Sequence, residues 1–214
     1  MKFCVIGLGR LGYQLAVVLA ENGMEVMAID SNESIVASIR DQVTQAICMR
    51  VSDEASLRSI GIEEMDTVIV AMGENFAQSI LITALLKKHL GIPKVIARAI
   101  NDIHKDILIL VGADRIVLPE KEVGTRLADT LSSSLTDLTR LTKEFSISKI
   151  RAPHSFVGKT IQELNLPDKY TVHCVGIEEN ANTITPVDKS YSIKQGDRLI
   201  VAGNNSDLEK LTKL

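Results

Sequence analysis

The chain has 214 residues, enough for one large domain or for one medium and one small domain. Hydrophobic residues make up 45% of it, so a packed core is expected and wholesale disorder is excluded. The formal net charge is −3 and aromatic residues are only 3%, which excludes a nucleic-acid partner held by a basic surface or by stacked aromatic rings.

The first residues enter a strand pattern at once, and no run of 18 apolar residues occurs. Neither a signal peptide nor a membrane span is therefore expected. The three cysteines, Cys4, Cys48 and Cys174, are far apart and none belongs to a CxxC pair, so no zinc site or disulfide framework is predicted. We expect a reducing, cytoplasmic setting.

The first 118 residues alternate short apolar runs with helical patterns, which is typical of βαβ units and a parallel sheet. The expected strands are Phe3–Gly7, Glu25–Asp30, Gln45–Arg50, Thr67–Ala71, Lys94–Ala99 and Arg115–Leu118. The expected helices are Leu11–Asn22, Glu33–Asp41, Asp53–Ile60, Gln78–Leu90 and Ile103–Val111, and a glycine follows four of them, at Gly23, Gly61, Gly91 and Gly112. Six strands with five crossovers predict a Rossmann-like, doubly wound α/β sheet.

A long helix is predicted next, from Glu120 to Leu141. Its apolar residues recur every three or four positions in one narrow stripe, made of Val123, Leu127, Leu131, Leu135, Leu138 and Leu141. Such a helix would be about 33 Å long. It either lies back on its own sheet or reaches a second copy of the chain, and the second interpretation is preferred because the helix connects two regions.

The remaining residues, from about 145 to 214, predict a small α+β domain. Strands are expected at Ser146–Arg151, Thr171–Ile177 and Arg198–Ala202, with helices at Thr160–Leu164 and Ser206–Leu211 and turns at 179–182 and 195–197. A domain of about 70 residues has a marginal core, so pairing with another subunit would help to stabilise it.

A glycine motif, Gly7-Leu8-Gly9-Arg10-Leu11-Gly12, follows the first strand and opens the first helix. Gly7 permits the tight turn, Gly9 lets the backbone approach a phosphate, and Gly12 lets helix and strand pack closely. Asp30 ends the second strand, where its carboxylate can accept hydrogen bonds from a ribose diol. Strand, glycine loop, helix and acid together predict a nucleotide site, whereas glycines that serve only the turn are the alternative.

Arg10 places a cation inside the glycine loop, which suggests more phosphate charge than a dinucleotide carries, as in ATP. A solvated first-turn residue is the alternative for Arg10. Gly73 and Asn75 follow the fourth strand and could flank the base, and Arg98 lies near the end of the fifth. Each of these three, taken singly, is more often structural than functional.

Catalytic motifs are missing from the sequence: there is no nucleophile elbow, no P-loop lysine and no helical pair of metal-binding histidines. The four histidines, His89, His104, His154 and His173, do not stand in a motif with a carboxylate. We therefore predict a protein that is not an enzyme, with a small NAD(H)-dependent oxidoreductase as the alternative.

Several motifs in order resemble the regulatory RCK subunits of bacterial Ktr and Trk potassium transport systems. They are KFCVIGLGRLG, EVMAID, DTVIVAMGEN, IARAIN and GADRIVLPEKEVG, followed in the tail by SFVGKTIQELNLP and QGDRLIVAGNNSDLEKL. The resemblance covers essentially the whole chain. One N-terminal and one C-terminal RCK domain is similar to the KtrA type rather than the tandem TrkA type.

The resemblance implies a cytoplasmic ring of dimers, commonly an octamer, at the inner face of the membrane beneath a potassium channel subunit of the KtrB/TrkH type. ATP or ADP binding would gate that channel, and NAD(H) is a further possible ligand. The helix from Glu120 would be the family's crossover helix. Arg10 would approach the ATP γ-phosphate, and Glu120 would help to hold a cation at the dimer interface.

The resemblance also implies a cleft for cyclic di-AMP lined by residues such as Ile161, Leu164, Tyr170 and Pro186. Pro167 stands where relatives carry an arginine, so this ligand is not assigned.

The predicted division is a nucleotide-binding domain at 1–119, a dimer-forming crossover helix and linker at 120–144, and an RCK C-terminal domain at 145–214. Glu120 is the candidate metal ligand. The candidate nucleotide-binding residues are Gly7, Gly9, Arg10, Leu11, Gly12, Asp30, Ser31, Gly73, Asn75 and Arg98.

Overall fold

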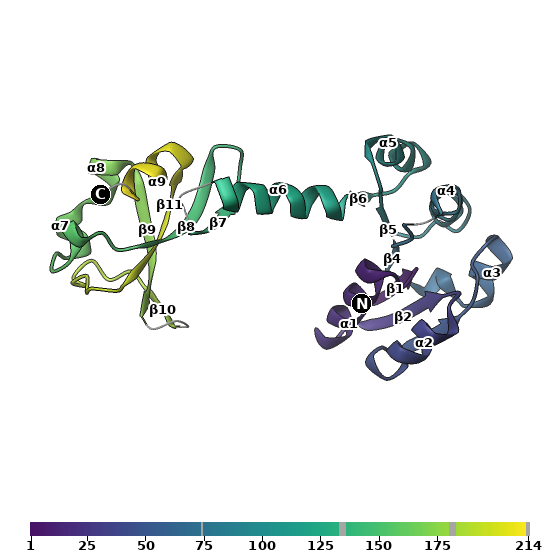
Figure 1. Cartoon of the computed structure of the whole chain (residues 1–214). Coiled ribbons are helices and arrows are strands. Elements are labelled where there is room, and N and C mark those ends of the chain that lie inside the picture. The colour runs from purple at the N-terminus through teal and green to yellow at the C-terminus, as the bar shows by residue number, and fades with distance from the viewer. Residues whose placement is uncertain (74, 133–135, 180–182, 213–214) are drawn as a thin grey trace. The chain divides into compact units, whose positions relative to one another are not determined.

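The computed structural model describes residues 1–73, 75–132, 136–179 and 183–212. The chain forms two compact units, Met1–Glu122 and Val123–Leu214. Figure 1 shows the helices and strands of both. No helix within the described ranges is both long and apolar enough to cross a membrane.

Six parallel strands form the sheet of the first unit, as far as the described residues show, in the order β3-β2-β1-β4-β5-β6. Their bounds are β1 Lys2–Ile6, β2 Glu25–Asp30, β3 Gln45–Cys48, β4 Thr67–Val70, β5 Lys94–Arg98 and β6 Arg115–Val117. This order is that of a dinucleotide-binding fold, so the predicted fold class is confirmed.

Helices cover both faces of this sheet (Figure 1). They are α1 Arg10–Glu21, α2 Glu33–Ile39, α3 Glu54–Ser59, α4 Phe76–Ala84 and α5 Asp102–Val111, with short turns η1 Arg40–Gln42, η2 Ile62–Glu64 and the π-helical η3 Leu85–His89. The helices α1 and α2 pack on one face through Ala16 and Ile39. The other face is covered by α3, α4 and α5 through residues such as Leu57, Ile82 and Leu108. All four glycines predicted to end helices have positive φ.

The second unit contains an antiparallel sheet with the order β10-β9-β11-β8-β7 among its described residues. Its elements are β7 Thr136–Arg140, β8 Phe145–Arg151, η4 His154–Phe156, α7 Ile161–Leu164, α8 Leu166–Tyr170, β9 Val172–Glu179, β10 Thr183–Pro186, β11 Arg198–Asn204 and α9 Asn205–Leu211. The three predicted strands and two predicted helices are present. Residues 180–182 of the predicted turn lie outside the described residues.

Among the residues that the structure describes, two other than glycine have positive φ, and they flank α8: Asn165 at 44° and Thr171 at 59°. The pattern-based prediction missed α8, β7 and β10. Each has only four or five residues, too few for a helical or strand periodicity to stand out.

The prediction of one helix as far as Leu141 is wrong. Helix α6 spans Pro119–Ser132, and β7 then pairs with β8. Thr136 and Thr139 are β-branched and favour a strand, and Leu138 packs against the core of the second unit instead of continuing the stripe. Leu135 lies outside the described residues. The stripe on α6 thus consists of Val123, Leu127 and Leu131.

The first helix approaches the sheet closely at Gly12, which is buried. A Cβ atom at this position would lie 1.9 Å from the Gly7 carbonyl oxygen and 3.0 Å from Ala71 Cβ. Backbone atoms cannot move aside as a flexible side chain can. Only glycine therefore lets α1 start directly over the turn that follows β1.

We predict that Gly12→Ala lowers the free energy of unfolding by about 1–3 kcal/mol or more, because the added methyl group overpacks a fixed backbone. Chemical denaturation monitored by circular dichroism measures the change. Gly9→Ala is the matched control, since nothing lies within 4 Å of a Cβ built at Gly9. Equal stability of the two variants would contradict the close packing at Gly12.

Candidate functional site

The candidate site lies at the carboxyl ends of β1, β2, β4 and β5. The strands β1 and β4 are neighbours, yet α1 packs on one face of the sheet and α4 on the other. The two connections leave in opposite directions, and doubly wound sheets bind their ligands in a crevice at such a point. The glycine loop follows β1, and Gly73 and Asn75 follow β4, so both flank this crevice.

The glycine loop makes a tight turn between β1 and α1. Gly7 has φ 93°, and its N–H donates to the Ile29 carbonyl at 2.8 Å. A Cβ there would meet Met72, at 2.9 Å from its Cγ and 3.2 Å from its backbone nitrogen. Gly7 thus has both a left-handed backbone and a close neighbour, as the motif predicts.

Gly9 differs from the other two glycines because the packing of the described residues does not require it. It is the N-cap of α1, it is exposed, and a Cβ there would meet nothing within 4 Å. No side chain caps the helix. The N–H groups of the first turn, which include Arg10 and Leu11, are therefore open to an anion that approaches over Gly9.

Arg10 is exposed, and its guanidinium has no hydrogen-bond or ion-pair partner within the described part of the chain. It is the first residue of α1, beside the open N–H groups. Helix dipole, backbone donors and guanidinium together favour negative charge at this point.

The carboxylate of Asp30 holds the glycine loop. Its Oδ2 accepts a hydrogen bond from Leu8 N at 2.6 Å, and its Oδ1 accepts one from Asn32 N at 2.8 Å. Each carboxylate oxygen has a further lone pair and can still accept from a ribose hydroxyl. Leu8 and Asp30 lie 22 positions apart in the sequence, and this hydrogen bond holds the loop against the acid.

The third strand ends beside Asp30, and pattern reasoning did not assign its residues to the site. Cys48 is the register partner of Asp30 on β3, and Met49 N donates to the Asp30 carbonyl at 2.8 Å. Cys48 is exposed, and its Sγ lies 3.8 Å from the carbonyl oxygen of the exposed Ser31. The strand order of this fold places β3 next to β2, so it could have predicted that Cys48 and Met49 lie beside Asp30.

Two residues predicted for different roles bind each other. Arg98, at the end of β5, donates from Nη2 to Glu120 Oε1 at 2.5 Å. The Arg98 guanidinium also lies against Gly73, where a Cβ would be 2.2 Å from Nη1. The pKa of Glu120 lies below its ordinary value because its own backbone N–H donates to the carboxylate, with a further contribution from Arg98. Asn75 caps α4, accepting from Gln78 N at 3.1 Å.

The role of Glu120 as a metal ligand stays a prediction. The described residues contain no group of three or more His, Cys, Asp or Glu side chains that could hold an ion. The partner of its carboxylate is a cation of the protein itself, Arg98.

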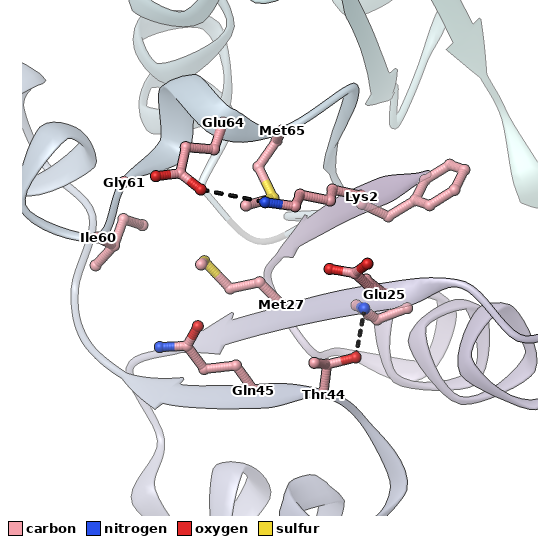
Figure 2. A pocket seen from close by; sticks show the side chains of 11 residues that line it. Lys2, Glu25, Met27, Thr44, Gln45, Ile60, Gly61, Glu64 and Met65 are labelled. Carbon is pink, nitrogen blue, oxygen red and sulfur yellow. Dashed lines mark hydrogen bonds and ion pairs between the residues drawn. The ribbon is translucent and has the colours of Figure 1, made fainter.

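A pocket of about 210 Å³ lies elsewhere, at the starts of β1, β2 and β3 (Figure 2). Met27 and Met65 line it together with polar side chains, and Lys2 Nζ pairs there with Glu64 at 3.2 Å. Lys2 and Glu25 begin their strands, whereas Asp30 ends one. The pocket is thus at the opposite edge of the sheet from the glycine loop.

The histidines of the first unit do not line the crevice as a catalytic pair. His104 is fully buried on α5, 4.4 Å from the Phe76 ring between centroids, and burial lowers its pKa. His89 Nδ1 lies 3.1 Å from Glu54 Oε2, a carboxylate contact that the sequence motifs did not predict. That pair joins η3 to α3, elements that carry none of the candidate site residues.

Both units of the chain match domains of known protein families. Residues 3–119 match the TrkA-N domain, and residues 146–214 match the TrkA-C domain. The chain belongs to the TrkA-N/TrkA-C family. It is 36% identical over 213 residues to Ktr system potassium uptake protein C of Bacillus subtilis (strain 168), covering 99% of this chain and 96% of that protein. It is 34% identical over 210 residues to protein A of the same system, covering 98% and 94%.

Solved structures of this fold include the GsuK channel bound to NAD, with a TM-score of 0.56 and 22% identity. The match covers 99% of this chain and 38% of that chain. A structure of GsuK bound to ADP matches with a TM-score of 0.53 and 26% identity, over 61% of this chain and 34% of that one. These matches show that the fold is shared with the GsuK structures.

We predict that Asp30→Ala destabilises the glycine loop, because Leu8 N and Asn32 N lose a charged acceptor. Loss of a hydrogen bond to a charged group costs about 1.5–3 kcal/mol. Faster hydrogen exchange at the Leu8 amide, followed by NMR, measures the effect. Asp30→Asn keeps one carbonyl acceptor and should show a smaller change. Unaltered exchange in Asp30→Ala would show that the carboxylate does not hold the loop.

Proposed function

We propose that this chain is a nucleotide-sensing regulatory subunit that gates a membrane potassium transporter. The site binds its ligand and does not transform it. The observation that carries this proposal is the open backbone at Gly9, beside the carboxylate of Asp30. A phosphate can approach the N-terminus of α1 there while the attached ribose reaches Asp30.

The proposed ligands are ATP and ADP, with NAD(H) as a further candidate. ADP is supported by the GsuK structure with that ligand, which is 26% identical to this chain. ATP is supported by Arg10, whose guanidinium has no partner among the described residues and suits the charge of an additional phosphate. Leu11 and Gly12 would donate backbone N–H groups, and Ser31, Gly73, Asn75 and Arg98 would surround the ligand.

The proposed assembly is a homodimer that builds a larger ring, with an octamer as the expected size. Val123, Leu127 and Leu131 are 55%, 56% and 77% exposed on α6, and a second chain would bury this apolar stripe. Residues 120–144 would act as the dimer-forming segment between domains at 1–119 and 145–214. Glu120 would hold a cation only together with groups from another chain.

The proposed partner is a membrane-embedded potassium channel subunit of the KtrB/TrkH type. Two Bacillus subtilis relatives named as Ktr potassium uptake proteins, at 34% and 36% identity over nearly full length, support this assignment. The chain would then work in the cytoplasm, associated with the inner face of the membrane. ATP and ADP would have to bind its two conformations with different affinity in order to gate the channel.

We predict that Arg10→Ala weakens binding of ATP more than binding of ADP or NADH, because only ATP offers a γ-phosphate. Isothermal titration at fixed salt gives the three dissociation constants. Arg40→Ala, another exposed arginine, is the control for net charge. An equal loss for all three ligands would reject the γ-phosphate role, and turnover of NADH with a carbonyl substrate would instead favour an oxidoreductase.

We predict that the chain is a multimer at micromolar concentration and that Leu127→Asp lowers its molar mass, because a charge in the stripe opposes burial against a second chain. Multi-angle light scattering measures the mass. Thr125→Asp introduces the same charge on α6 outside the stripe and should leave the mass unchanged. A wild-type monomer would refute the proposed role of α6.

A further inference from the structure

The Arg98 side chain is held in place at the carboxyl end of β5. It is 21% exposed, its guanidinium lies against Gly73, and its Nε is buried without a hydrogen-bond partner among the described residues. Arginine keeps its charge at any ordinary pH. A permanent cation is thus held at one place, and Glu120 is its anionic partner within the described part of the chain.

Glu120 is held far less firmly than Arg98. Its side chain is 68% exposed, and it belongs to the first turn of α6. An ion pair with so exposed a partner contributes about 0–1 kcal/mol. Another anion of higher charge can therefore displace this carboxylate without disrupting the core.

Arg98 and the glycine loop contact consecutive residues of the segment after β4. Met72 packs on Gly7, and the next residue, Gly73, packs on the Arg98 guanidinium. A phosphate bound over the loop would approach Arg98, whose guanidinium is already paired with the Glu120 carboxylate. The ligand would therefore have to compete with Glu120 for the Arg98 guanidinium.

We propose that Glu120 is a built-in counter-ion that occupies Arg98 in the empty protein and that a nucleotide phosphate must displace. This inference rests on the proposed nucleotide-binding function. It also predicts the sign of the effect of Glu120, because its carboxylate opposes ligand binding. Ligand binding in turn frees the first turn of α6 from β5. By linkage, any group that draws Glu120 away from Arg98 strengthens nucleotide binding by the same factor.

The test is the binding of ADP to Glu120→Gln in buffer with EDTA, measured by isothermal titration. Removing the carboxylate charge frees Arg98, so the dissociation constant should fall about threefold to fivefold. Damage to the fold would weaken binding, so it cannot imitate this gain. Inorganic pyrophosphate, titrated in the same way, should also bind more tightly, because the competition concerns charge and not the adenosine.

Two further variants decide whether the gain passes through Arg98. In an Arg98→Gln background, Glu120→Gln should change the dissociation constant by less than about twofold, as a double-mutant cycle requires. Asp102→Asn is the matched control, because Asp102 is 67% exposed and pairs with Lys121 at 2.9 Å instead of Arg98. It should leave ADP binding unchanged.

Weaker or unchanged ADP binding by Glu120→Gln, with wild-type protein that binds ADP, would overturn the counter-ion role and leave the proposed function intact. The same gain in Asp102→Asn or in the Arg98→Gln background would overturn it as well, since net charge would then be the cause. Failure of every variant, the wild type included, to bind ADP would overturn both proposals.

Discussion

The hydrogen bond from Leu8 N to the Asp30 carboxylate is the constraint on which the candidate site depends. It is 2.6 Å long and joins the glycine loop after β1 to the end of β2. Besides this bond, the Gly7 N–H donates to the Ile29 carbonyl, and the loop glycines pack against Met72 and Ala71. With the Leu8–Asp30 bond, the loop backbone and the acid that are proposed to bind the phosphate and the ribose keep a fixed separation before any ligand arrives, which would reduce the ordering cost of binding.

The first unit was predictable because local and long-range preferences agree there. The strands of the sheet are centred on short apolar runs, and glycines with positive φ follow four of the five predicted helices. The spacing of Gly7, Gly9, Gly12 and Asp30 predicted that the glycine loop and the acid lie together, and the Leu8–Asp30 hydrogen bond joins them. Parallel strands place their carboxyl ends at one edge, so residues far apart in sequence could be grouped before the structure was seen.

The remaining features depend on contacts that periodicity does not encode. The stripe of leucines continues past Ser132 in the sequence, yet Leu138 packs in the core of the second unit, and tertiary packing outweighs helical spacing there. The Arg98–Glu120 pair was equally hidden, because each residue had been assigned a different ligand. Their ion pair becomes visible only in the folded structure, where the Arg98 guanidinium meets the Glu120 carboxylate.

The three cysteines differ in burial and should therefore differ in reactivity toward thiol reagents. Cys4 is completely buried, and burial raises the pKa of its thiol far above the ordinary range, whereas partial burial raises the pKa of Cys174 to about 11. Thiol reagents need the thiolate, so both should be inert near neutral pH. Cys48 alone of the three is exposed, on the strand beside Asp30. A maleimide dye would consequently mark the ribose end of the crevice in the natural sequence, without any engineered residue.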